Sequence, residues 1–335
     1  MSQTTNPPAP AVAASKRRVI PVSILTGFLG AGKTTLLNHI LREQSEYKFA
    51  VIVNEVGKVG IDGALVENQR DEVVELSNGC VCCTVRKDLV LGIQKLLKRG
   101  GFDYLLIETT GIADPGPVAQ TFVNIPALQQ FVQLDGIITV VDAEQIFRQM
   151  KETDVAGAQI ALADTILLNK TDLVDENHAK QVTQRIRAIN PHCAIIRSQQ
   201  SKVNLKLLLD VHAFDVDQKL AVDPAFLDEL RGDRTHADIA SCAFDFDQPF
   251  DVEKFEAFVQ QLTEREKVYR SKGFLAVAGH NHRAIFHGVN NRFHIFWDRP
   301  WREGETRRSQ FVFIGKKLDE AKIEKGLRAC LKSDK

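Results

Sequence analysis

Short runs of apolar, often β-branched residues alternate with stretches of helical periodicity over the first part of the chain. The helical pattern is clear at residues 36–41 and at 88–97, and again over 176–189, where Asn190-Pro191 ends it. The apolar runs lie at 19–25, 49–53, 104–107, 136–141, 166–168 and 194–196. Buried strands that alternate with helices are typical of parallel sheets with crossover connections. This part is therefore predicted to be an α/β, doubly wound and mainly parallel sheet.

The pattern changes after residue 238, where short strand-like segments follow one another. Strands are predicted at 243–246, 274–278, 285–288, 293–297 and 311–314, with helices near 251–265 and 318–332. This arrangement predicts a smaller α+β domain with a mainly antiparallel sheet. The polar segment 211–238 predicts a linker, and the Pro/Ala/Ser/Thr-rich segment 1–18 predicts a disordered tail. The two domains are thus expected at 19–210 and 239–332.

Length and charge narrow the class of protein. A chain of 335 residues is long enough for two domains with separate cores, and 44% hydrophobic and 26% charged residues are typical of globular proteins. Lys plus Arg equals Asp plus Glu at 43 each, so nucleic acid and anionic lipid are not the expected partners. The apolar runs are too short to cross a membrane, and a cytoplasmic location is expected. Whether the chain forms a homo-oligomer is left open.

A glycine-rich segment after the first predicted strand carries the strongest motif. Gly27-Phe28-Leu29-Gly30-Ala31-Gly32-Lys33-Thr34 matches G-x-x-x-x-G-K-[ST], in which backbone N–H groups, a lysine and a hydroxyl surround phosphates and Mg²⁺. The strand before it and the helix after it favour nucleotide binding over a plain glycine-rich turn. The residues expected to contact the phosphates or Mg²⁺ are Gly27, Gly30, Ala31, Gly32, Lys33, Thr34 and Thr35.

A second motif, Asn169-Lys170-Thr171-Asp172, follows the predicted strand 166–168. An aspartate at this place can accept hydrogen bonds from the two donors on the edge of guanine, which adenine lacks. GTP is therefore the expected nucleotide, with Asn169, Lys170 and Asp172 at the base. The alternative is a polar turn that caps the next helix.

The segment Glu108-Thr109-Thr110-Gly111 lies between these motifs in the sequence. Glu108 is expected to orient the magnesium shell, and the backbone N–H of Gly111 to contact the γ-phosphate. The alternative for Glu108 is an acidic strand end without function. Lys33, Thr34 and Glu108 are the expected catalytic residues. Since no water-orienting Gln or arginine finger is evident, slow intrinsic GTP hydrolysis is predicted.

Cys80, Cys82 and Cys83 bring three thiols together within four residues. Thiolates bind zinc and similar soft ions, and in a reducing compartment such a cluster favours metal binding over disulfides. Water, Glu55 or a client group could complete the site. Inert buried cysteines and a redox switch are the alternatives. A second group, His280, His282, His287 and His294, is either an accessory metal or client site or a set of structural histidines.

These motifs together resemble the CobW-like GTPases, a P-loop family of metallochaperones, and segments such as Trp297-Asp298-Arg299-Pro300-Trp301 resemble its C-terminal domain. The resemblance implies a GTPase that binds Zn²⁺, or Co²⁺, in a nucleotide-dependent way and delivers it to a client metalloprotein. The other interpretation is a regulatory GTPase switch whose cysteines are structural or redox-sensing. The sequence departs from the family at Val53 and Lys58, where relatives often carry acidic residues; if those carboxylates form an auxiliary metal site in relatives, that site is weakened here.

Overall fold

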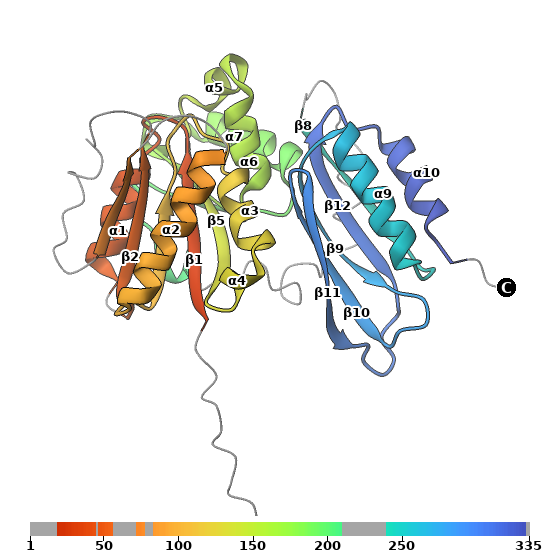
Figure 1. Cartoon of the computed structure of the whole chain (residues 1–335). Coiled ribbons are helices and arrows are strands. Elements are labelled where there is room, and N and C mark those ends of the chain that lie inside the picture. Colours follow the sequence, from red (N-terminus) through yellow and green to blue (C-terminus); the bar gives the residue numbers. More distant parts are fainter. Residues whose placement is uncertain (1–18, 45, 56–71, 78–82, 210–238, 333–335) are drawn as a thin grey trace, which may run out of the picture.

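The computed structural model describes residues 19–44, 46–55, 72–77, 83–209 and 239–332, which form two sheets flanked by helices (Figure 1). Within these residues the first sheet has seven parallel strands in the order β3-β2-β4-β1-β5-β6-β7. Its strands are β1 (Ile20–Gly27), β2 (Phe49–Glu55), β3 (Glu72–Ser77), β4 (Tyr104–Glu108), β5 (Val132–Asp142), β6 (Thr165–Asn169) and β7 (Ala194–Arg197). The doubly wound parallel sheet predicted from the apolar runs is confirmed.

Helices cover both faces of this sheet. Helix α1 packs its apolar residues, such as Leu36 and Ile40, on one face, and helices that include α2, α3 and α6 pack on the other. The helices are α1 (Lys33–Glu43), α2 (Cys83–Arg99), α3 (Gly116–Asn124), α4 (Pro126–Gln129), α5 (Ile146–Glu152), α6 (Asp154–Leu162) and α7 (Glu176–Ile189), with short 3-10 turns η2 (Thr171–Leu173) and η3 (Leu205–Leu207). The predicted helix 176–189 is confirmed, and Asp175 caps its first turn by accepting from the His178 N–H.

The second sheet has five antiparallel strands in the order β11-β10-β9-β12-β8, again among the described residues. Its strands are β8 (Ile239–Phe246), β9 (Lys267–Ala276), β10 (His282–Val289), β11 (Arg292–Pro300) and β12 (Ser309–Lys316). Helices α9 (Val252–Arg265) and α10 (Glu320–Ala329) pack on one face over a phenylalanine-rich core. The predicted antiparallel α+β unit is confirmed. The exact domain limits, 19–210 and 239–332, stay predictions.

We call the first sheet with its helices the first unit, and the second sheet with its helices the second unit. The face of the second sheet that α9 and α10 leave uncovered lies against the first unit (Figure 1). The largest apolar cluster of the first sheet extends into the second through Ile239, Tyr269, Val289, Val312 and Ile314. Because these side chains share one buried cluster with the helices of the first sheet, the two units pack against each other through a continuous apolar interface.

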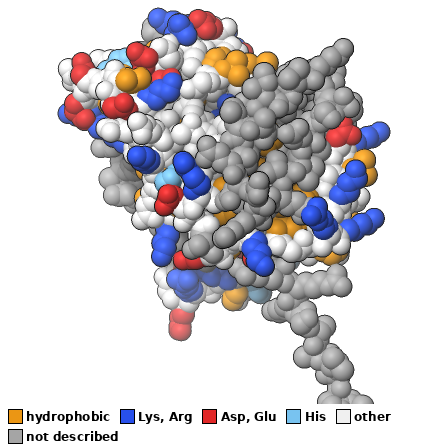
Figure 2. Space-filling model, turned by 90° about the vertical axis from the view of Figure 1, so that its left-hand side faces the viewer, with side chains coloured by type: hydrophobic (Ala, Val, Ile, Leu, Met, Phe, Trp, Pro, Cys, Tyr) orange, Lys and Arg blue, Asp and Glu red, His pale blue; other side chains and the backbone are white. Residues whose placement is uncertain are grey.

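Two strands differ most from their prediction, for physical reasons. Strand β3 is not predicted, because it lies at the edge of the sheet and its apolar run is short. Strand β9 begins at Lys267, whereas the sequence predicted a start at residue 274. The earlier part was missed because Arg270 and Lys272 interrupt the apolar pattern, although Arg270 is buried. No helix among the described residues is long and apolar enough to span a membrane. On the face shown in Figure 2, Lys and Arg side chains are spread out, with Asp and Glu between them.

Candidate nucleotide site

The predicted nucleotide residues lie at one edge of the first sheet. Strand β1 is parallel to β4 and to β5, and β5 is parallel to β6. The carboxyl ends of these strands therefore lie at the same edge of the sheet. The phosphate loop follows β1, Gly111 follows β4, and Asp172 follows β6. In α/β sheets ligands bind at this edge, so segments far apart in the sequence meet where a nucleotide would bind.

Two glycines of the phosphate loop fill positions that other residues could not. Gly32 has a φ of 111°, and a Cβ built there would lie 2.5 Å from Nδ2 of Asn169. Gly27 has a φ of 141°, and its Cβ would lie 2.2 Å from the carbonyl oxygen of Val140. A backbone this tightly curved leaves its N–H groups to face phosphate oxygens, as the motif requires.

Lys33, Thr34 and Glu108 come together beside this loop. The Thr34 hydroxyl donates to Oε1 of Glu108 over 3.0 Å, and Glu108 is almost fully buried. Lys33 is also buried, and its Nζ donates to the Phe28 carbonyl over 3.2 Å. A hydroxyl and a carboxylate are ligands or orienting groups that suit Mg²⁺, so this donor set fits the expected metal. Thr35 is exposed in the first turn of α1.

Asn169 connects the two predicted motifs. Its Nδ2 donates to the Ala31 carbonyl over 2.9 Å and to the Ser201 hydroxyl over 3.0 Å. Its Oδ1 accepts from the Ser198 hydroxyl and from the Ser201 N–H. The Ser201 hydroxyl in turn donates to the Gly32 carbonyl. The loop expected to read the base therefore also holds the phosphate loop in its shape.

Ser198 and Ser201 are missing from the residues predicted by sequence. Their position could have indicated a role, because they follow the predicted strand 194–196 at the same edge of the sheet as the other site loops. Asp142 at the end of β5 was missed in the same way. It forms a 2.8 Å ion pair with Lys170, which holds a left-handed backbone with a φ of 59°. Asp172 is exposed in η2 next to this pair.

Gly111 lies directly against the phosphate loop. A Cβ at Gly111 would lie 2.6 Å from the backbone nitrogen of Leu29. From α6, the Nε2 of Gln159 donates to the carbonyls of Gly111 and Ala113, over 3.3 and 3.1 Å. Gln159 is a further residue that sequence reasoning missed, because nothing near it in the sequence marks it as a partner of this segment.

The predicted metal residues fall mostly outside the described part of the chain. Cys80, Cys82 and Lys58 lie outside it, and of Cys83 and Glu55 only the backbone is described, at the start of α2 and the end of β2. Val53 is buried in the core beneath α1. Among the described residues no group of three or more His, Cys, Asp or Glu is arranged to hold a metal ion.

The histidines of the second sheet are spread over several environments. His287 and His294 face each other on β10 and β11, and His287 is buried with its ring stacked on Phe296. His280 is exposed and stacks on Trp297. Their proposed roles as an accessory metal or client site stay predictions.

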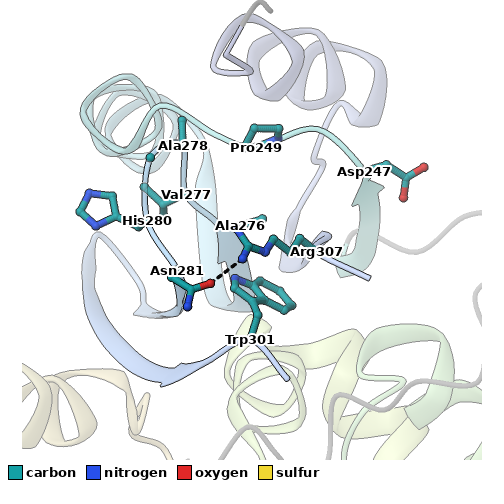
Figure 3. A pocket seen from close by; sticks show the side chains of 10 residues that line it. Asp247, Pro249, Ala276, Val277, Ala278, His280, Asn281, Trp301 and Arg307 are labelled. Atoms are coloured by element: carbon teal, nitrogen blue, oxygen red, sulfur yellow. Dashed lines mark hydrogen bonds between the residues drawn. The ribbon is translucent and has the colours of Figure 1, made fainter. Parts of the chain in front are cut away.

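A separate cavity of about 330 Å³ opens in the second unit (Figure 3). Its lining includes Asp247, His280, Asn281, Trp301 and Arg307, and Arg307 donates a hydrogen bond to Asn281. These residues all belong to the second sheet and its loops. The cavity is therefore distinct from the nucleotide site on the first sheet.

Comparison with known proteins gives two family matches. Residues 21–197 match the CobW/HypB/UreG nucleotide-binding domain, and residues 239–331 match the cobalamin synthesis protein cobW C-terminal domain. The zinc chaperone YjiA of Escherichia coli is 38% identical over 312 residues, covering 91% of this chain and 96% of that protein. The zinc-regulated GTPase metalloprotein activator 1 of Dictyostelium discoideum is 34% identical and covers 94% of this chain and 80% of that protein.

Among solved structures, the Zn(II)-bound YjiA GTPase from E. coli superimposes with a TM-score of 0.72 at 34% identity. The match covers 94% of this chain and 100% of that chain. The similarity thus extends over both sheets.

Proposed function

The chain belongs to the CobW/HypB/UreG family, and from this premise we propose that it is a GTP-hydrolysing metal chaperone that carries zinc to a client metalloprotein. Relatives named as zinc chaperones and as zinc-regulated GTPases span almost the whole chain. The observation that supports the proposal is the hydrogen bond from Asn169 to the Ala31 carbonyl, which brings together two motifs 138 positions apart, as a guanine-nucleotide site would require.

Within this site each residue has a distinct task. The backbone N–H groups between Gly27 and Lys33 and the ammonium of Lys33 bind the phosphates, and Asp172 accepts from the guanine edge. Thr34, hydrogen-bonded to Glu108, would hold Mg²⁺, whose charge would neutralise the charge that develops on the phosphate oxygens. Gly111 contacts the terminal phosphate, which GDP lacks, so its segment can differ between the two nucleotide states.

Zinc is the proposed cargo, held by thiolates of Cys80, Cys82 and Cys83. Two or three ligands from one segment leave a coordination position open, and an open position suits transfer to a client. Since three clustered thiols stay reduced in the cytoplasm, that is the proposed location. By linkage, if GTP tightens zinc binding, zinc tightens GTP binding by the same factor.

The test is the zinc content of anaerobically purified protein with GDP and with a non-hydrolysable GTP analogue. We expect stoichiometric zinc that depends on the nucleotide and is lost in the Cys82→Ser, Cys83→Ser double variant. Cys330→Ser is the matched control, because burial raises the pKa of the Cys330 thiol to about 11 and keeps it from acting as a thiolate ligand. Zinc content that changes neither with the nucleotide nor with the cysteine substitutions would favour a regulatory GTPase switch instead.

A further inference from the structure

The turn between β10 and β11 brings the second sheet to the segment that follows Gly111. Asn290 in this turn donates its side-chain amide to the carboxylate of Asp114. The same carboxylate accepts the Gly116 N–H over 2.8 Å at the start of α3. Asp114 is therefore held from both sides, once by its own segment and once by the second sheet.

Neighbouring contacts fix the turn in place. The Nε2 of Gln120 on α3 donates to the Val289 carbonyl over 2.9 Å, and the Asn290 N–H donates to the Tyr269 carbonyl. Val289 and Tyr269 belong to the apolar cluster shared by both units. The turn is thus a rigid part of the interface, so the position of the Asn290 amide is well defined.

The amide matters because Asp114 is partly buried. Burial raises the pKa of Asp114, while the bonds from Gly116 and Asn290 and the charge of Lys267 lower it. A buried carboxylate whose donors are removed is left with an uncompensated desolvation cost. Loss of the Asn290 donor therefore favours another arrangement of the segment that carries Asp114.

That segment is the one next to the phosphates. Gly111, three residues before Asp114, lies against Leu29 of the phosphate loop, and Gln159 holds the carbonyls of Gly111 and Ala113. Gln159 fixes one end of the segment from the first unit, and Asn290 fixes the other end from the second. Gly111 thus lies in a segment that is held from both units.

We propose that Asn290 is a positioning residue for GTP hydrolysis, which acts from the second sheet through Asp114 to orient Gly111 toward the terminal phosphate. The proposal rests on the proposed function only in the assignment of Gly111 to that phosphate. The second unit then takes part in nucleotide chemistry through Asp114, although the phosphate loop, Asn169 and Asp172 all belong to the first unit.

Two single variants test the contact without straining the turn. Asn290 has a φ of 52°, a conformation that glycine and aspartate tolerate, so Asn290→Gly removes the amide and Asn290→Asp replaces it with a repelling carboxylate. We expect kcat for GTP to fall about tenfold in each, the size of a lost bond to a charged group. Affinity for GDP should stay within about twofold, because GDP has no phosphate at Gly111.

A third variant reaches the same contact from the other side. A Cβ at Gly116 would lie 2.2 Å from Nδ2 of Asn290, so Gly116→Ala should push the amide away and lower kcat in the same manner. The control is Asn281→Asp in the turn between β9 and β10, which is exposed and remote from Asp114, and it should leave kcat unchanged.

The decisive experiment exchanges the two partners. Asp114→Asn combined with Asn290→Asp again sets an amide donor opposite a carboxylate, and we expect kcat to return to within about threefold of the wild-type value. Wild-type kcat in both Asn290 variants would overturn the proposal. So would a parallel loss of GDP affinity and melting temperature, which indicates a merely structural role. A chain that hydrolyses GTP in this way yet binds no zinc would refute the chaperone function alone.

Discussion

Asp164, just before β6, and Arg270 on β9 form an ion pair of 2.7 Å between the two units, and their side chains are only 2% and 4% exposed. Burial alone would raise the pKa of Asp164, but attraction to Arg270 and Lys272 outweighs it and holds the pKa below its usual range. The other carboxylate oxygen accepts the Ile137 N–H, and Arg270 also donates to the Leu162 carbonyl. The pair therefore fixes how the second sheet lies on the first.

Asp164→Ala should destabilise the protein strongly, because it leaves the Arg270 charge buried without its carboxylate. We expect the free energy of unfolding to fall by about 3–5 kcal/mol, measured by urea denaturation. Asp154→Ala is the matched control, since Asp154 pairs with Lys316 between the same two units but is half exposed. Its loss should be at most about 1 kcal/mol. Equal losses in the two variants would contradict this view of the interface.

His192 should make stability depend on pH. Burial lowers the pKa of His192 to about 4, helped by repulsion from Lys272 and Arg187. The unfolded chain binds this proton near pH 6.5, so the free energy of unfolding should decrease by about 3 kcal/mol as pH falls from 6.5 to 4. In His192→Asn this part of the decrease should disappear, as urea midpoints at pH 7.5 and 4.5 would reveal. The same pH response in both proteins would rule out His192 as its source.

The Asn169→Ala substitution should weaken the binding of GTP and of GDP to the same extent. The substitution removes the donor to the Ala31 carbonyl and the acceptor for Ser201, so the phosphate loop loses its support whichever nucleotide is bound. We expect about a tenfold loss of affinity for each nucleotide, measured by fluorescence titration with labelled analogues. A loss of affinity for GTP alone would contradict the role of Asn169 in holding the phosphate loop in its shape.

Asp172→Ala should change base selectivity instead. Inosine triphosphate lacks the exocyclic amine of guanine, so the wild-type chain should prefer GTP over it by about tenfold or more. The variant should bind the two nucleotides almost equally, because the acceptor that distinguishes them is gone. A retained preference in competition titrations would show that another residue reads the base.

The sequence predicted those parts of the site whose chemistry is local. The phosphate loop and Asn169 to Asp172 were found because each motif keeps its functional residues within a few positions. Gln159, Ser201 and Asn290 were not, since each acts on a partner tens to more than a hundred positions away. Only the folded backbone brings such pairs together.

The same distinction holds for the fold. Apolar runs located most strands of the first sheet, but the beginning of β9 was hidden because Arg270 and Lys272 look like surface residues. Their burial is compensated by Asp164, which lies 106 positions before Arg270. A pattern of hydrophobic and polar positions cannot register a charge that is buried only because a distant residue pairs with it.

The apolar cluster shared by the two sheets also limits how the chain can be divided. A fragment that ends near residue 209 would expose to water the apolar surface that Val289, Val312 and Ile314 cover, and it would leave Asp164 without its cations. Such a fragment would tend to self-associate. We therefore expect nucleotide turnover to be measured reliably only on the intact polypeptide, for which a truncated P-loop half is a poor substitute.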